Sequence, residues 1–121
     1  MSFAADALAP AAVTRRAARR EALIAGLRAA LAARLPGPGI RAVLLFGSWA
    51  RGDFEGASDI DLLVLTDPGV PPRAFDTATL PDAARLDVVM VDAMAHAAAA
   101  GSGDPFHARV AREAVPLWAT G

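Results

Sequence analysis

The stretch from Val43 to Leu65, VLLFGSWARGDFEGASDIDLLVL, constrains the fold of this chain more than any other. Two short apolar runs, Val43–Phe46 and Ile60–Leu65, flank a polar segment that is dense in Gly, Ser and Asp. Short β-branched or leucine-rich runs that are bounded by turn formers are typical of buried β-strands. The stretch therefore predicts two strands joined by a polar connection.

Two acids, Asp59 and Asp61, open the second of these strands with one residue between them. Because strand side chains alternate between faces, both carboxylates are expected on one face, while Ile60 and Leu62 pack on the other. Carboxylates this close repel each other unless a cation or a proton lies between them. Mg²⁺ takes oxygen ligands and completes its shell with water and phosphates. The pair thus predicts a cation site, and the alternative is a solvated strand end with two acids by chance.

Composition narrows the class of protein. The 121 residues predict a single domain over residues 1–121, with residues 1–13 as a flexible N-terminal segment. The chain has no Cys, which excludes disulfides and Cys-based zinc sites, and no Lys, which excludes a Schiff base. With a net charge of −1, we expect no direct nucleic-acid binding. We expect no membrane segment and no signal peptide, so the expected location is cytoplasmic.

Further elements are predicted on both sides of the central stretch. They are an amphipathic helix from an N-cap at Thr14 to the stop at Pro36, strands over 40–46 and 86–91, helices over 92–100 and 105–114, and an edge strand over 115–118. Residues 73–84 predict either a single helical turn or an open loop. The arginines of the first helix either bind an acidic partner or form its solvated face.

The central stretch also predicts phosphate chemistry. A Gly47-Ser48 turn after a strand exposes backbone N–H groups to an anion, and the Ser48 hydroxyl adds a donor. Arg51 follows one turn later and is expected to reach the same anion. The carboxylates of Asp59 and Asp61 would hold Mg²⁺ on a polyphosphate. Asp87, at the start of the next strand, would share a second metal ion and help to deprotonate an acceptor hydroxyl.

The residues of this central stretch resemble a known family. Gly47-Ser48, ten further residues and then Asp59-Ile60-Asp61 resemble the signature of the DNA polymerase β-like nucleotidyltransferase superfamily. The fuller string GSWARGDFEGASDIDLLV is similar to its minimal nucleotidyltransferase branch, where Gly-Ser-x-Ala-Arg-Gly and Ser-Asp-x-Asp-Leu are typical. The resemblance implies a nucleotide-binding set of Gly47, Ser48, Arg51 and Ser58, and a catalytic, metal-binding set of Asp59, Asp61 and Asp87.

The resemblance implies an α/β (α+β) fold, a polymerase β-like core in which a mixed sheet of about four strands is backed by helices. It also implies a two-metal Mg²⁺ site and transfer of a nucleoside monophosphate, AMP from ATP, to a hydroxyl. Many stand-alone members of this size are antitoxins that are paired with a HEPN-domain RNase toxin, and some transfer AMP to a tyrosine of that toxin. This chain has no Tyr, so a tyrosine acceptor would lie on another chain.

Two alternatives stay open from the sequence. One is a nucleotidyltransferase that acts on a small molecule such as an aminoglycoside, with a homodimer or a separate helical subunit closing the acceptor site. The other is a catalytically silent antitoxin that only binds its toxin. The three acids argue against the silent form, because clustered carboxylates without a cation destabilise a domain.

Overall fold

The computed structural model describes residues 3–120, with side chains described from residue 10 onward. The elements in chain order are α1 (Phe3–Arg34), β1 (Ile40–Phe46), α2 (Ser48–Arg51), β2 (Ile60–Thr66), the 3₁₀ turns η1 (Pro72–Ala74) and η2 (Ala83–Arg85), β3 (Leu86–Asp92), α3 (Ala93–Gly101), α4 (Pro105–Glu113) and β4 (Val115–Ala119). The strands form one sheet in the order β3-β2-β1-β4.

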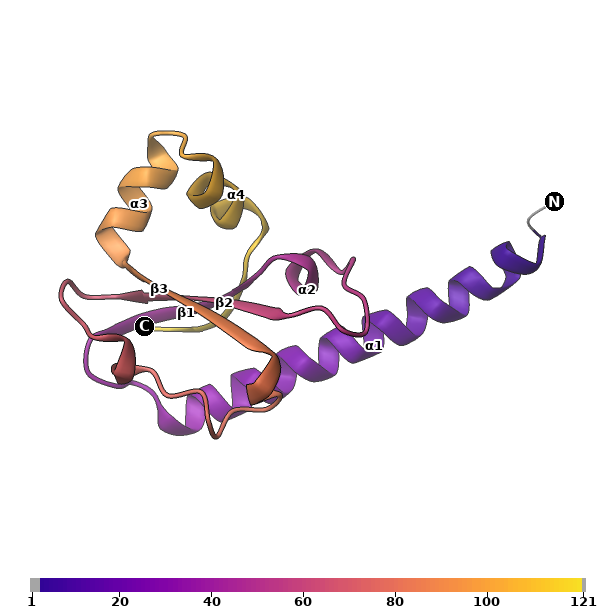
Figure 1. Cartoon of the computed structure of the whole chain (residues 1–121), viewed down its shortest axis with the longest axis horizontal. Coiled ribbons are helices and arrows are strands. Elements are labelled where there is room, and N and C mark those ends of the chain that lie inside the picture. Colours follow the sequence, from indigo (N-terminus) through magenta and orange to yellow (C-terminus); the bar gives the residue numbers. More distant parts are fainter. Residues whose placement is uncertain (1–2, 121) are drawn as a thin grey trace.

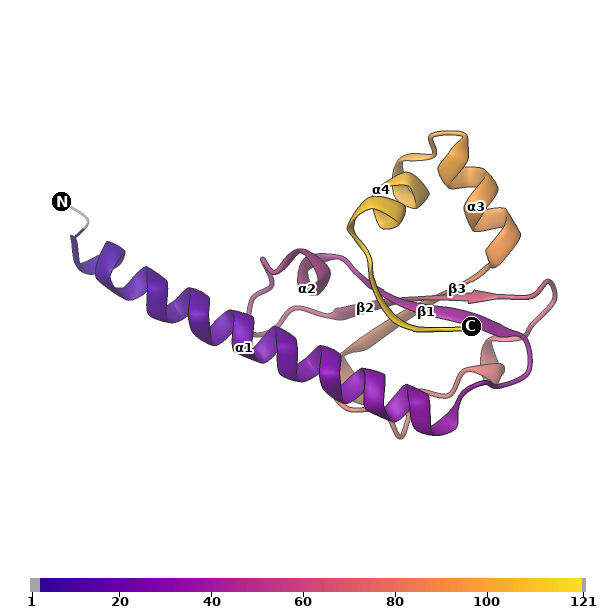
Figure 2. The same cartoon turned by 180° about the vertical axis from the view of Figure 1, so that it is seen from behind.

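The sheet is mixed, as the fold class predicted. β1 lies antiparallel to both β2 and β4, whereas β2 and β3 are parallel. Helix α1 and the segment between β2 and β3 cover one face, and α3 and α4 lie over the other (Figures 1 and 2). This arrangement of a four-stranded mixed sheet with helices on both sides confirms the predicted architecture.

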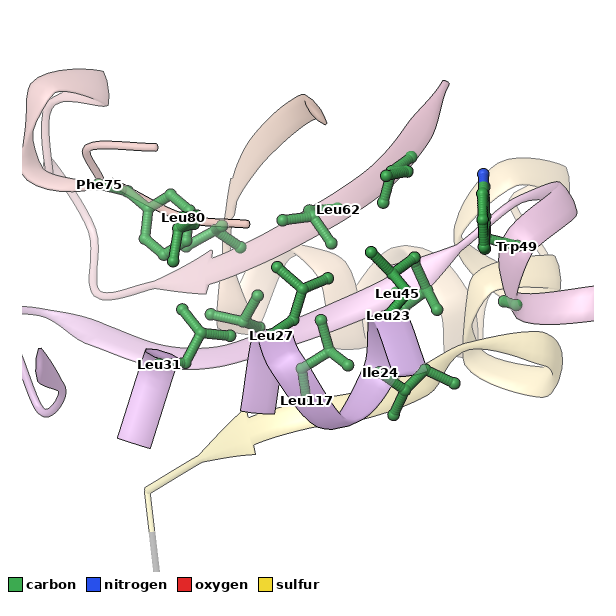
Figure 3. Packing of buried hydrophobic residues seen from close by; sticks show 14 of the residues in the cluster. Leu23, Ile24, Leu27, Leu31, Leu45, Trp49, Leu62, Phe75, Leu80 and Leu117 are labelled. Carbon is green, nitrogen blue, oxygen red and sulfur yellow. The ribbon is translucent and has the colours of Figure 1, made fainter. Parts of the chain in front are cut away.

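The core lies between α1 and the sheet, as Figure 3 shows. The leucines of α1 recur every four residues and so occupy one face of the helix. Leu27 and Leu31 are fully buried there. Alternate residues of the central strands, including Leu45 and Leu62, meet them from the sheet. Burial of each such side chain contributes about 1.5–3 kcal/mol, so this layer holds α1 against the sheet.

The predicted start of the first helix at Thr14 is wrong. Helix α1 begins at Phe3 and continues through Pro10, and the Thr14 hydroxyl donates to the Pro10 carbonyl at 2.8 Å rather than capping a helix. Pro10 removes one helical hydrogen bond, but it is exposed, so water can satisfy the freed carbonyl. Residues 3–13 of the predicted flexible segment are helical, and residues 1–2 lie outside the described part.

The proline-rich connection between β2 and β3 forms two separate 3₁₀ turns rather than one helical turn or an open loop. Phe75 and Leu80 are buried in the α1 side of the core and anchor the connection. Arg34 of α1 donates to the Asp76 carbonyl and, at 3.2 Å, to the Thr79 hydroxyl. The segment therefore belongs to the folded domain.

The C-terminal elements follow the predicted pattern. The Asp104 carboxylate accepts from the His107 N–H at the start of α4, and the Asp92 carboxylate caps α3 in the same way. Strand β4 lies at an edge of the sheet, where Pro116 is tolerated. Among residues 3–120, no helix has the length and apolar character that crossing a membrane requires.

Candidate active site

The turn between β1 and α2 packs closely against the side chain of Asp61. Gly47 has φ 73° and ψ −154°, and α2 begins at the next residue. A Cβ atom on Gly47 would lie 2.3 Å from Oδ2 of Asp61. Only glycine combines this positive φ with so close an approach. The Asp61 carboxylate is therefore in contact with the backbone of the turn that was predicted to bind phosphate.

The strand register places two of the predicted carboxylates side by side. Asp61 of β2 pairs with Asp87 of β3 in the parallel register, so both side chains leave the same face of the sheet. Ile60 and Leu62 are buried on the opposite face, as alternation predicted. Asp59 lies one residue before β2 and is exposed.

The electrostatics of Asp61 reflect this crowding. Burial raises the pKa of Asp61, the charges of Asp87 and Asp59 raise it further, and Arg51 opposes them. A divalent cation would relieve this repulsion, because it favours the charged form of each carboxylate.

These residues have the donor chemistry that Mg²⁺ needs. Carboxylate oxygens are its preferred protein ligands, and one or two of them suffice when substrate phosphates and water complete the shell. Within the described residues, no group of three or more His, Cys, Asp or Glu side chains is placed closely enough to hold a metal ion. Convergence of Asp59, Asp61 and Asp87 on one metal centre thus stays a prediction, whereas Asp61 and Asp87 are neighbours.

Arg51 ends the short helix α2 beside this turn. Its backbone N–H donates to the Gly47 carbonyl at 3.1 Å, which closes the turn. Its guanidinium lies 3.2 Å from the Asp53 carboxylate and 3.6 Å from that of Glu113. The hydrogen bond that Arg51 donates to Asp53, followed by the charges of Asp53 and Glu113, raises the pKa of Arg51. The Arg51 guanidinium is therefore a permanent cation beside the Gly47 turn.

Ser58 and Arg85 hold the loop that leads to Asp59. The Ser58 hydroxyl accepts from the Glu55 N–H at 2.8 Å, and the Ser58 carbonyl accepts from Nη2 of Arg85 at 2.8 Å. Arg85 also donates to the Gly56 carbonyl at 2.9 Å. Sequence reasoning missed Arg85, since no motif marks an arginine that acts through backbone carbonyls. Its only signal was its place directly before the strand of Asp87.

Trp49 is not available to a ligand. It is buried and stacked on Phe54, with ring centroids 3.5 Å apart and an interplanar angle of 6°. Arg20 of α1 donates to the carbonyls of Trp49 and Ala50 at 2.9 and 2.8 Å, which ties α2 to α1. Trp49 therefore supports the turn from the core side.

Comparison with known proteins completes the description of the site. No curated protein matches the chain. Among solved structures, it is similar to a chain in a crystal structure of a toxin-antitoxin with AMP-PNP, at 28% identity and a TM-score of 0.44. The match covers 69% of this chain and 64% of that chain. The nucleotidyltransferase domain family matches residues 24–110, which contain all the candidate site residues. The chain belongs to the nucleotidyltransferase domain family.

Proposed function

We propose that the protein is a Mg²⁺-dependent nucleotidyltransferase that transfers AMP from ATP to a hydroxyl of a partner protein. The observation that carries this proposal is the contact between the Gly47 turn and the Asp61 carboxylate, with Asp87 beside it in register. This contact would place a phosphate-binding turn next to carboxylates that bind cations, within a nucleotidyltransferase domain.

Each candidate residue has a role in this proposal. Asp59, Asp61 and Asp87 would hold Mg²⁺, which when bound neutralises phosphate charge and stabilises the attacking and leaving oxygens. Backbone N–H groups at Gly47 and Ser48 would bind the phosphates, and Arg51 would add a positive charge there. Asp87 would accept the proton of the acceptor hydroxyl. Ser58 would act by holding the loop before Asp59, through its bond to Glu55.

The proposed partner is a HEPN-domain toxin that the protein modifies and thereby neutralises. Two sequence features support it: the string GSWARGDFEGASDIDLLV, with its likeness to the minimal nucleotidyltransferase branch, and the absence of Tyr. The N-terminal part of α1 projects beyond the sheet (Figure 2). The exposed arginines Arg15, Arg16 and Arg19 follow this part, where α1 lies beside α2 and the loop after α2. Such a surface beside the site would suit an acidic partner.

The test uses the open reading frame next to this one. The two proteins are co-expressed and purified together, and the intact mass of the neighbour is measured after incubation with ATP and Mg²⁺. We expect a gain of one AMP or a small multiple. The double variant D59N/D61N should abolish the gain, whereas Asp67→Asn, at the far end of β2, should retain it.

Other outcomes would favour the alternatives. A stable complex without a mass change would favour an antitoxin that only binds. Labelling that persists in the D59N/D61N variant would remove the proposed roles of these acids. If the neighbour neither binds nor gains mass, transfer of AMP to an aminoglycoside by the purified chain would identify a small-molecule enzyme.

A further inference from the structure

A hollow of about 160 Å³ opens between the Gly47 turn and helix α4. Phe46, Gly47 and Arg51 line one side of it, and Phe106, Arg109 and Glu113 line the other. Gly47, which contacts the Asp61 carboxylate, and Arg51 line this hollow, so it adjoins the candidate active site. The family resemblance assigned no residue of α4 to the site.

The walls of the hollow favour an anion. Phe46 and Phe106 meet edge to face with ring centroids 5.5 Å apart and form an apolar side, next to which a charge is poorly screened by water. The Glu113 carboxylate lies 3.6 Å from Arg51 and compensates that cation. Arg109, in contrast, has no carboxylate within ion-pair distance among the described residues. It is the uncompensated charge of the hollow.

The size of the hollow favours a small anion. Its volume of about 160 Å³ suits two phosphate groups better than a nucleoside with its phosphates. A guanidinium is also the side chain best matched to phosphate oxygens, because its planar fork donates two hydrogen bonds at once. Arg109 faces this space from the side opposite the turn.

We propose that Arg109 binds the β- and γ-phosphates of the donor nucleotide, opposite the Gly47 turn. This inference rests on the proposed function and adds a residue to the same site. In the transfer, the acceptor oxygen bonds to the α-phosphorus and the bond from that phosphorus to the bridging oxygen breaks. The electron pair stays on the departing pyrophosphate, and the hydroxyl proton passes to Asp87. Arg109 stabilises the charge that accumulates on pyrophosphate.

The test measures binding and needs no acceptor. Affinities for ATP, AMP and inorganic pyrophosphate are measured by isothermal titration calorimetry in the presence of Mg²⁺. For Arg109→Ala we expect a loss of about 10-fold or more in affinity for ATP and pyrophosphate, the usual effect of removing a hydrogen bond between charged groups. Affinity for AMP should be unchanged. Arg109→Lys should recover part of the loss, because it restores the charge without the fork.

Arg112→Ala is the matched control, since it removes the same charge from the same helix outside the hollow. It should leave all three affinities unchanged, and melting temperatures should confirm that both variants fold. Equal losses for ATP and AMP in Arg109→Ala, or no loss at all, would overturn the inference and leave the proposed function standing. If the wild-type protein binds none of the three ligands, the proposed function fails with it.

Discussion

At Gly47 the backbone passes so close to Asp61 that a methyl group does not fit between them. The residue has two separate requirements, a positive φ and an empty space where Cβ would be. Gly69 shares the first requirement, with φ 77°, but has nothing within 4 Å of its Cβ position. A comparison of substitutions at Gly47 and Gly69 therefore separates the effect of backbone strain from the effect of crowding against the Asp61 carboxylate.

We predict that Gly47→Ala abolishes nucleotide transfer, whereas Gly69→Ala leaves it unchanged. Both variants should lose about 1 kcal/mol of stability from the positive φ, and Gly47→Ala should lose more because Asp61 must move. Urea unfolding and the mass-shift assay together check this. Full activity in Gly47→Ala would show that the contact with Asp61 is not needed.

Asp61 itself is expected to destabilise the fold at neutral pH when no cation is bound. Its pKa is raised, so the folded protein holds this proton more tightly than the unfolded chain does. Stability from this group is therefore present below the ordinary carboxyl pKa of 3.8 and is lost as the pH rises through the higher folded value. An uncharged side chain in place of Asp61 would not cause this loss of stability.

We predict that Asp61→Asn raises the melting temperature at pH 7 without Mg²⁺ by about 2 °C, a small effect because solvent screens a partly exposed group. The difference in melting temperature between the variant and the wild type should become smaller at acid pH. Added Mg²⁺ should stabilise the wild type and not the variant, since binding to the folded state adds stability. Thermal scans at both pH values provide the measurement, and a variant that melts below the wild type at pH 7 would contradict it.

At the residue scale, much of the site could be predicted from the sequence, but the register between β1 and β2 could not. The face of Asp61 follows from strand alternation, which is local, and burial of Ile60 and Leu62 on the other face agrees with it. Asp59 lies before β2, so a common face with Asp61 stays a prediction. The contact between Gly47 and Asp61 depends on the register of β1 against β2, in which Phe46 is the partner of Asp61. No local pattern specifies that register.

At the scale of elements, a hydrogen bond between two histidine side chains connects α3 and α4. Nδ1 of His96 lies 2.7 Å from Nδ1 of His107, so one ring donates and the other accepts. This hydrogen bond requires at least one neutral ring, because two imidazolium rings both donate. Burial lowers the pKa of His96, and the charge of His107 lowers it further.

We predict that the packing of α3 on α4 weakens in mild acid. Since the folded pKa of His96 is below its ordinary value of 6.5, the unfolded chain binds more protons below that pH. Stability is thus present above pH 6.5 and is lost as the pH falls toward the folded pKa. Between pH 7.5 and 5.5, the wild type should lose more degrees of melting temperature than His96→Gln. Equal losses in both proteins would refute a role for the pair.

At the scale of the whole molecule, one layer of packing holds the domain together. The α1 leucines belong to a single apolar cluster that also includes residues of the proline-rich connection and residues from all four strands. Leu27 is fully buried in this layer, whereas Val13, on the same helix, is 60% exposed. Truncation of these two side chains should therefore have very different effects on global stability.

We predict that Leu27→Ala lowers the free energy of unfolding by about 3 kcal/mol, because it removes apolar contacts and leaves a cavity. Val13→Ala should change it by less than about 0.5 kcal/mol, as surface substitutions usually do. Urea titrations give both values. A small loss in Leu27→Ala would mean that the layer between α1 and the sheet is not the main source of stability.

The fold was predictable where each element carries its own signal. The strands are marked by short apolar runs between turn formers, α4 by its cap Asp104, and the buried face of α1 by leucines that recur every four residues. The strand order and the anchoring of Phe75 and Leu80 were not predictable, because both depend on residues far apart in the sequence. The start of α1 was not predictable because proline usually ends a helix, whereas here the alanine-rich segment continues as a helix through Pro10.

The order of strands has a consequence for synthesis. Strand β1 and its partner β2 are both synthesised by residue 66, but the other edge of β1, from Ala42 to Leu45, pairs with β4, which begins only at Val115. During translation that apolar edge has no strand beside it, and open edges of this kind are where nascent chains aggregate. The yield of folded protein in a cell should therefore depend on translation speed and on chaperones more than the stability of the mature domain would suggest.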